Sequence, residues 1–291
     1  MFAIIYNPFS GKGNADRIAG QIQEVLCSRG ENATFYPTCA EGDGVNQARR
    51  ALGDGCLQLV CIGGDGTLSE IVGVVAGSDA TLYIVPTGTG NDFARVLGLP
   101  RDPMEAFIAQ LGGREAHLDC GKINGRPFLN VAGSGFDVEV LRSMEELKKI
   151  YPGPKAYRKA VFSTLEKFSA FEADVSIDGG VFEHVRTTII EIANGQYIGG
   201  GMRVAPGARP DDGLFNVVIV SKVPRWTVPF LLPLFIMGAH VHLPVARVVS
   251  AKRLVMRAPG MVVEVDGQLE QMDQAEFEIM PGALKVMRPA K

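Results

Sequence analysis

The first part of the chain alternates short apolar runs with longer mixed segments. Apolar runs near residues 2–6, 32–37, 57–62 and 82–85 are typical of buried strands. The segments between and after them predict helices near 14–29, 43–52, 67–76, 91–98 and 103–111. Strands that alternate with helices predict a parallel sheet covered by helices. We therefore expect an α/β domain over residues 1–122.

Beyond about residue 115 the pattern changes to short strands separated by turn signals such as Asn124-Gly125 and Asp266-Gly267. Residues 123–291 therefore predict a mainly antiparallel β-sandwich, interrupted by helices near 138–150 and 155–169. We expect the last strand, about 283–291, to return to the first domain. The predicted strands lie near 115–123, 128–133, 172–178, 181–194, 214–221, 247–257, 262–266, 275–280 and 284–288.

A glycine-rich turn, Gly63-Gly64-Asp65-Gly66-Thr67, joins the third predicted strand to a helix. Glycines let main-chain N–H groups approach a phosphate without side chains in the way. The aspartate in the middle repels phosphate, so it is better suited to holding a metal ion or accepting a proton. Ordinary turn chemistry is the alternative in a chain with 35 glycines.

Two further loops are expected at the same edge of the sheet. The loop Pro86–Asp92, with the sequence PTGTGND, follows the fourth strand, and Asn7–Gly13 follows the first. In the latter, Lys12 stands between two glycines and suits a phosphate. Because ligands bind outside the carboxyl ends of parallel strands, the three loops together predict a phosphate-binding site.

The three loops resemble those of the bacterial lipid kinases of the diacylglycerol kinase catalytic-domain superfamily, relatives of sphingosine and ceramide kinases. The GGDGT turn is shared with NAD kinases, whereas PTGTGND is more specific to the lipid kinases. Asp211-Asp212-Gly213-Leu214 and Val265-Asp266-Gly267-Gln268 extend the resemblance over nearly the whole chain. It implies an NAD-kinase-like first domain, with ATP in the cleft between the domains and lipid in the second.

The resemblance also implies which residues contact ATP. Thr38 matches a family position, although a helix cap is an equal interpretation. Glu70, one helical turn after Gly66, either orients Lys12 or the metal, or is a solvated helix residue. The implied contacts are Asn7, Pro8, Ser10, Gly11, Lys12, Thr38, Gly63, Gly64, Asp65, Gly66, Thr67, Glu70, Gly88, Thr89 and Asn91.

Four residues are candidates for the chemistry of transfer. Asp65 and Asp119 are the acids expected near the transferred phosphate, with hinge capping as the alternative for Asp119. Gln268 stands where the family has a glutamate taken as the general base, and an amide cannot accept the proton. One alternative is that Asp65 acts as the base. Another is that Glu270 does so, because it lies two residues after Gln268 and points to the same face of the strand. The third is that the protein is a weak or inactive relative.

The turn at residues 211–214 has a separate interpretation, because bacterial members of the family hold a structural Mg²⁺ there. By position, Asp212 would supply its side chain, and Arg209 and Leu214 would supply main-chain carbonyl oxygens. Hard cations favour such oxygen ligands. The alternative is a plain β-turn without metal.

Composition and charge add little to this picture. The net charge of −3 gives no indication of a nucleic-acid partner. The five cysteines lack CxxC spacing and no leader is recognisable, so we expect reduced thiols in a cytoplasmic protein. No apolar stretch reaches about 18 residues. The apolar segment Val228–Met237, with Trp226 at its edge, is either a buried helix or a bilayer contact.

The sequence thus predicts a lipid kinase that uses ATP and Mg²⁺ to phosphorylate a hydroxyl of a diacylglycerol-like lipid. A lipid substrate at a membrane surface predicts peripheral contact with the inner face of the membrane. Two alternatives stay open: an NAD-kinase-like phosphotransferase acting on a soluble nucleotide, and a weak or inactive relative that binds lipid or nucleotide. The pattern determines neither the lipid nor the oligomeric state.

Overall fold

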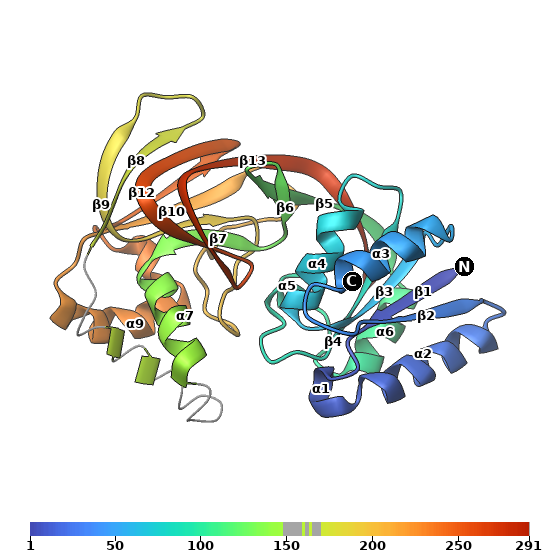
Figure 1. The fold of residues 1–291 in the computed structure, drawn as a ribbon. Coiled ribbons are helices and arrows are strands. Elements are labelled where there is room, and N and C mark those ends of the chain that lie inside the picture. The colour runs from blue at the N-terminus through green and yellow to red at the C-terminus, as the bar shows by residue number, and fades with distance from the viewer. Residues whose placement is uncertain (148–158, 161–162, 165–169, 291) are drawn as a thin grey trace.

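The computed structural model describes residues 1–147, 159–160, 163–164 and 170–290. An α/β domain, blue to cyan in Figure 1, lies beside a larger region that is rich in antiparallel strands. The predicted helix at 155–169 and the end of the one at 138–150 fall largely outside the described residues. The predicted change from an α/β pattern to a pattern of antiparallel strands is confirmed.

The first domain is a parallel sheet in the order β4-β3-β1-β2, with helices on both faces. Successive residues of the first strand enter different cores, because side chains alternate along a strand. Ala3 and Ile5 pack in one core, and Phe2 and Ile4 pack in the other. The elements are β1 (Phe2–Tyr6), α1 (Ser10–Gly13), α2 (Ala15–Ser28), β2 (Ala33–Pro37), α3 (Gly44–Gly53), β3 (Gln58–Gly63), α4 (Asp65–Val75), β4 (Thr81–Pro86), α5 (Asp92–Val96) and α6 (Pro103–Leu111).

The second domain is built from antiparallel strands, with α7 and α9 on one side of them (Figure 1). Its core includes Phe128, which stacks on Phe215 at 5.8 Å between ring centroids and meets Phe277 edge-on. The elements are β5 (Arg114–Ile123), β6 (Arg126–Phe128), β7 (Val131–Gly135), α7 (Phe136–Leu147), β8 (Phe171–Ile177), β9 (Glu183–Ala193), β10 (Phe215–Ser221), η1 (Arg225–Thr227), α9 (Val228–Met237), η2 (Ala239–His242), β11 (Ala246–Ala251), β12 (Arg253–Val265) and β13 (Gln268–Arg288).

The last strand joins the two halves. Separate strands at 275–280 and 284–288 were the expectation, with a turn at Pro281-Gly282, and this expectation is wrong. β13 runs without interruption for 21 residues, and its register shifts between Met280 and Leu284. The strand pairs with β12, then with β5, and finally in parallel with β4. A bulge bends a strand without ending it, so one 13-stranded sheet runs through both domains.

Candidate functional site

The three predicted phosphate loops contact one another at the carboxyl edge of the parallel sheet. The Thr87 amide donates to the Gly63 carbonyl oxygen at 2.9 Å. The hydroxyls of Ser10 and Thr87 are 2.7 Å apart. A β-carbon on Gly88 would lie 2.5 Å from the Gly64 α-carbon, so this approach requires glycine. Lys12 falls within α1, and its side chain lies outside the part of the molecule that the structure describes.

The loop after β4 is shaped by its own asparagine. Asn91 has a left-handed backbone with φ of 51°. Its side-chain oxygen accepts from the Gly88 amide at 3.0 Å, and its side-chain nitrogen donates to the Gly88 carbonyl oxygen at 2.8 Å. Both ends of the amide are therefore used within the loop, so Asn91 shapes the predicted ATP-binding loop.

Asp65 lies where the two glycine-rich loops meet. It is the first residue of α4, and its Oδ1 accepts from the amide of Asp92, at the start of α5, at 2.8 Å. A β-carbon on Gly90 would come within 2.8 Å of Asp65 Oδ2. Burial raises the pKa of Asp65, and the surrounding main-chain amides oppose this shift. The carboxyl group is thus placed and partly desolvated, as a proton acceptor in phosphoryl transfer requires.

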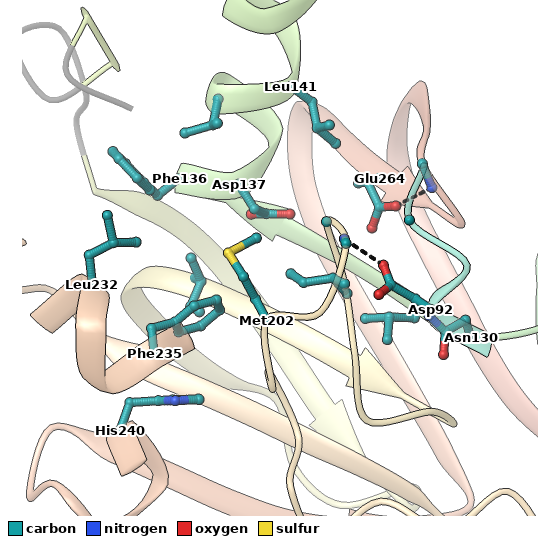
Figure 2. A pocket seen from close by; sticks show the side chains of 18 of the residues that line it. Asp92, Asn130, Phe136, Asp137, Leu141, Met202, Leu232, Phe235, His240 and Glu264 are labelled. Atoms are coloured by element: carbon teal, nitrogen blue, oxygen red, sulfur yellow. Dashed lines mark hydrogen bonds between the residues drawn. The ribbon is translucent and has the colours of Figure 1, made fainter. Parts of the chain in front are cut away.

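A cavity of about 860 Å³ extends from these loops into the second domain (Figure 2). Asp65, Thr89 and Asp92 line it at the first domain, and most of the remaining wall is apolar. Typical small-molecule sites measure about 300–1,000 Å³. The apolar wall is formed largely by Phe136, Val140, Leu141, Ile189, Val220, Leu231, Leu232 and Phe235. The edge that carries the predicted phosphate loops thus opens onto a largely apolar cavity.

Two further aspartates tie the domains together beside this cavity. Asp92 Oδ2 accepts from the Gly200 amide at 2.8 Å. Asp266 accepts from the Ser69 hydroxyl at 2.9 Å and from the Leu129 amide at 2.7 Å. Burial raises the pKa of both aspartates. Each carboxylate therefore joins a residue of one domain to the main chain or side chain of the other.

Asp119 does not join Asp65, which corrects the expectation that both acids lie near the transferred phosphate. Its Oδ2 accepts from the Gly213 amide at 2.7 Å, and its Oδ1 accepts from the Gly282 amide at 2.8 Å. Asp119 is buried and is not part of the cavity wall. Because both oxygens hold main-chain turns at the crossing between domains, the hinge-capping alternative describes its position.

Glu70 is also placed differently from its expected role beside Lys12 or a metal ion. Its two carboxylate oxygens accept from the amides of Gly42 and Gly44, at 2.9 and 2.8 Å. These amides lie at the beginning of α3, where main-chain donors lack helical partners. Thr38 is buried, its amide donates to the Tyr6 carbonyl oxygen, and it is not the cap of α3.

Gln268, which stands at the family's base position, and Glu270, one of its two expected replacements, lie in the hairpin of β12 and β13, outside the cavity wall. Gln268 is exposed and pairs with Val265, and Glu270 forms an ion pair with Arg126. Neither is part of the cavity wall, although Asp266 and Gly267 just before them are. Glu270 as the replacement base stays a prediction, and its carboxylate is engaged by Arg126 outside the cavity wall.

The turn predicted to hold a metal ion gathers negative charge. Asp212 Oδ1 accepts from the Leu214 amide at 3.1 Å. Burial raises the pKa of Asp212, and the charges of Asp119 and Asp211 add to the shift. Arg209 is exposed at this turn. A cation would relieve this repulsion, so the residues fit a metal ion, and the Mg²⁺ site stays a prediction.

Sequence reasoning missed three acids: Asp137 and Glu264, which line the cavity, and the buried Glu191 (Figure 2 labels the first two). One carboxylate oxygen from each lies within 4.8 Å of the other two. A signal for two of them was present, because each glutamate interrupts an apolar strand, as in Ile190-Glu191-Ile192 and Val263-Glu264-Val265. A charge inside a buried strand marks a functional candidate.

The helix α9 has apolar side chains on both its inner and outer sides. Leu232 and Phe235 line the cavity, whereas Phe230 is 74% exposed and Trp226, just before the helix, is 73% exposed. Among the described residues, no helix combines the length and the apolar character needed to cross a bilayer.

Comparison with known proteins identifies both halves of the chain. The model of the diacylglycerol kinase catalytic domain matches residues 1–123, and that of the YegS C-terminal NAD kinase beta sandwich-like domain matches residues 130–288. The diacylglycerol kinase of Staphylococcus carnosus is 30% identical over 98% of this chain and 94% of its own length. That of Bacillus subtilis is 29% identical, over 98% of this chain and 95% of its own length.

Solved structures agree on the fold. A diacylglycerol kinase from Bacillus anthracis superposes with a TM-score of 0.74, at 21% identity, over 99% of this chain and 96% of that chain. An NAD kinase from Archaeoglobus fulgidus, solved in complex with ATP, has a TM-score of 0.57 at 13% identity, over 100% of this chain and 95% of that chain. The matching family models and the curated relatives show that this chain belongs to the diacylglycerol kinase family of ATP-dependent lipid kinases.

Proposed function

We propose that this kinase transfers the γ-phosphate of ATP to the free hydroxyl of a diacylglycerol-like lipid. The observation that carries the proposal is the shape of the cavity, which begins at the phosphate loops and continues between apolar side chains. Transfer of an acyl chain from water to such an apolar wall is favourable. The hydroxyl of the same molecule then lies toward the acidic end, beside Asp65.

Asp65 is the proposed proton acceptor for the lipid hydroxyl. It lines the cavity, and its raised pKa brings it nearer to the range in which a carboxylate accepts a proton effectively. When bound with ATP, Mg²⁺ neutralises charge on the transferred phosphate. Asp92, which lines the same end of the cavity, is the residue that would hold the ion.

The outer side of α9 is the proposed contact with the membrane. Trp226, Phe230 and Met237 are exposed apolar side chains beside a helix whose other side lines the cavity. A helix that is apolar all round is usually buried, so exposure of this one favours an apolar surface as its partner. A lipid could then pass from the bilayer into the cavity without crossing water.

The test offers purified protein and Mg²⁺ with γ-labelled ATP to three acceptors in turn: diacylglycerol in mixed micelles, a total lipid extract, and NAD. We expect label in the organic phase with diacylglycerol. Label in a different extracted lipid would support lipid-kinase activity but would show that diacylglycerol is not the acceptor. Label on NAD alone would support the soluble-nucleotide alternative.

A further inference from the structure

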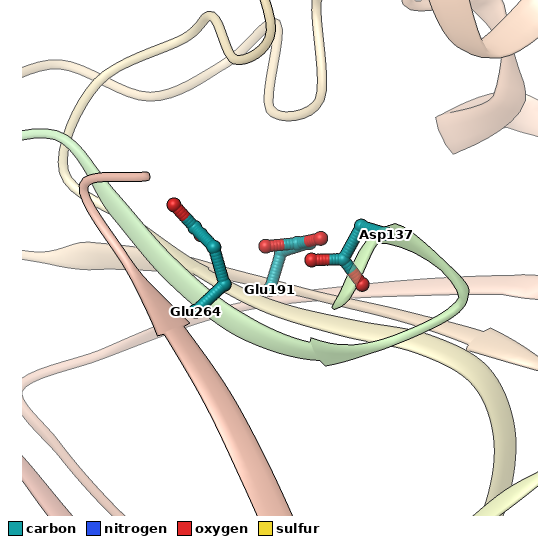
Figure 3. A group of neighbouring side chains, drawn as sticks. All are labelled: Asp137, Glu191 and Glu264. Carbon is teal, nitrogen blue, oxygen red and sulfur yellow. The ribbon is translucent and has the colours of Figure 1, made fainter. Parts of the chain in front are cut away.

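Three carboxylates from three elements converge at the inner wall of the cavity. Glu191 comes from β9, Glu264 from β12, and Asp137 from the first turn of α7. Figure 3 shows the Asp137 and Glu191 carboxylates facing each other, with the Glu264 side chain rising on the same side of the sheet. Asp137 and Glu264 line the cavity, and Glu191 lies beneath them.

A glycine makes room for this convergence. Gly133 of β7 pairs with Glu191 on one side and with Glu264 on the other, so the three positions form one row across the sheet. A β-carbon on Gly133 would collide with Glu191 Oε2. Because Gly133 has no side chain, the carboxylates of Glu191 and Glu264 can approach each other above it.

The convergence leaves buried negative charge without hydrogen bonds. Glu191 is fully buried, and neither of its carboxylate oxygens has a hydrogen-bond partner among the described residues. Oδ1 of Asp137 likewise has none there. A buried carboxylate whose oxygens have no hydrogen-bond partner is costly, so a bound cation would stabilise the charged form of this cluster.

The spacing fits a hard divalent cation. Oxygen ligands lie about 2.0–2.1 Å from Mg²⁺ and about 2.3–2.6 Å from Ca²⁺, so opposite ligands are roughly 4–5 Å apart. One carboxylate oxygen from each of the three residues lies within 4.8 Å of the other two. The open side faces the cavity, where water or a ligand oxygen can complete the coordination.

We propose that Asp137, Glu191 and Glu264 form a binding site for a divalent cation in the wall of the lipid cavity. This site is separate from the phosphate loops and from the turn that contains Asp212. The ion would neutralise the buried acids and present a positive charge to oxygen atoms of a molecule in the cavity. Ion binding needs neither ATP nor lipid, so the proposal stands apart from the kinase assay.

The experiment counts Mn²⁺ ions bound to the full chain by electron paramagnetic resonance, without nucleotide or lipid. We expect Glu191→Gln to bind one ion fewer than the wild type, because the amide keeps the size of the side chain and removes its charge. Asp212→Asn is the matched control, and it should retain the ion that Glu191→Gln loses. Thermal unfolding should show Mn²⁺ stabilising the wild type more than Glu191→Gln.

Equal numbers of ions with equal affinity in the wild type and Glu191→Gln would overturn the proposal, because protons alone would then satisfy the cluster. If Glu191→Gln fails to fold, Asp137→Asn makes the same comparison from the helix side of the cluster. Loss of the ion in Asp212→Asn but not in either cluster variant would place the bound metal at the other turn and would also overturn it.

Discussion

The Oδ1 atom of Asp65 accepts a hydrogen bond from the main-chain amide of Asp92, 2.8 Å away. One carboxylate thus begins α4 in the first glycine-rich loop and also holds the start of α5 in the second. Main-chain amides at a helix start lack helical partners and favour a nearby negative charge. The acid proposed for catalysis is therefore also a structural link between the two loops.

This double role separates two substitutions at position 65. In Asp65→Asn the amide oxygen can still accept from Asp92, so we expect kcat to fall by about 10² or more with little loss of stability. Asp65→Ala also loses the helix cap, which costs about 1 kcal/mol of unfolding free energy. Label transfer and urea unfolding measure the two effects. Wild-type kcat in Asp65→Asn would remove this residue from the chemistry.

Restoring a glutamate in Gln268→Glu should change the rate little. The side chain is exposed and outside the cavity wall, so we expect kcat within about threefold of the wild type, whereas a positioned base contributes roughly 10² to 10⁴. Steady-state label transfer measures this. Glu270→Gln is the control at the same hairpin, and it should be equally silent. A rise of about 10² in Gln268→Glu would place the acceptor hydroxyl at this hairpin.

The apolar cavity should sense the length of the acyl chains. Leu232 projects from α9 into the cavity (Figure 2), and Leu232→Trp would fill part of the space. We expect KM for a long-chain diacylglycerol to rise about tenfold or more, because the contacts of even one methylene group are worth roughly 1–3 kcal/mol. KM for a short-chain diacylglycerol should change less. An equal change for both substrates would exclude this part of the cavity as the acyl site.

Membrane contact through α9 predicts weaker vesicle binding when its exposed apolar residues are removed. The double variant Trp226→Ala/Phe230→Ala should bind phospholipid vesicles about 10²- to 10⁴-fold more weakly, since each large side chain contributes about 1.5–3 kcal/mol on burial. Vesicle sedimentation measures this. Val181→Ser is the control, because Val181 is 89% exposed in the turn between β8 and β9, away from α9 (Figure 1). Unchanged binding in the double variant would contradict the contact.

His240 should make the fold less stable in mild acid. It is buried in the cavity wall, its ring lies 3.0 Å from the Val204 carbonyl oxygen, and burial lowers its pKa below 6.5. The folded state then binds fewer protons than the unfolded state. The contribution of His240 to the free energy of unfolding therefore decreases as pH falls from 6.5 toward the lower pKa of the folded state. Urea unfolding from pH 7.5 to 5.5 should show a flatter pH dependence in His240→Gln. A parallel pH dependence in both proteins would contradict this assignment.

Much of the fold could be predicted from the sequence because local pattern determines it. Apolar runs such as Leu59–Ile62 form buried strands wherever they lie, and glycine turns after them leave main-chain amides accessible. The loops at 63–67 and 86–92 could thus be assigned to one sheet edge before any coordinate was known. The bends of β13 could not, because a proline–glycine pair is a turn signal in isolation and a bulge when neighbouring strands continue the pairing.

Side-chain partners were decided by the tertiary structure, because they depend on residues far away in the chain. Asp119 and Glu70 look like site acids in the sequence, yet each is held by amides of distant turns. Glu191 and Glu264 are 73 positions apart. Their carboxylates come close because their strands flank β7, and the β7 residue between them is Gly133, which has no side chain. The sequence by itself determined the glycine-rich loops predicted to bind phosphate and their place at one sheet edge, whereas strand order, set by long-range pairing, decided which carboxylates face the cavity.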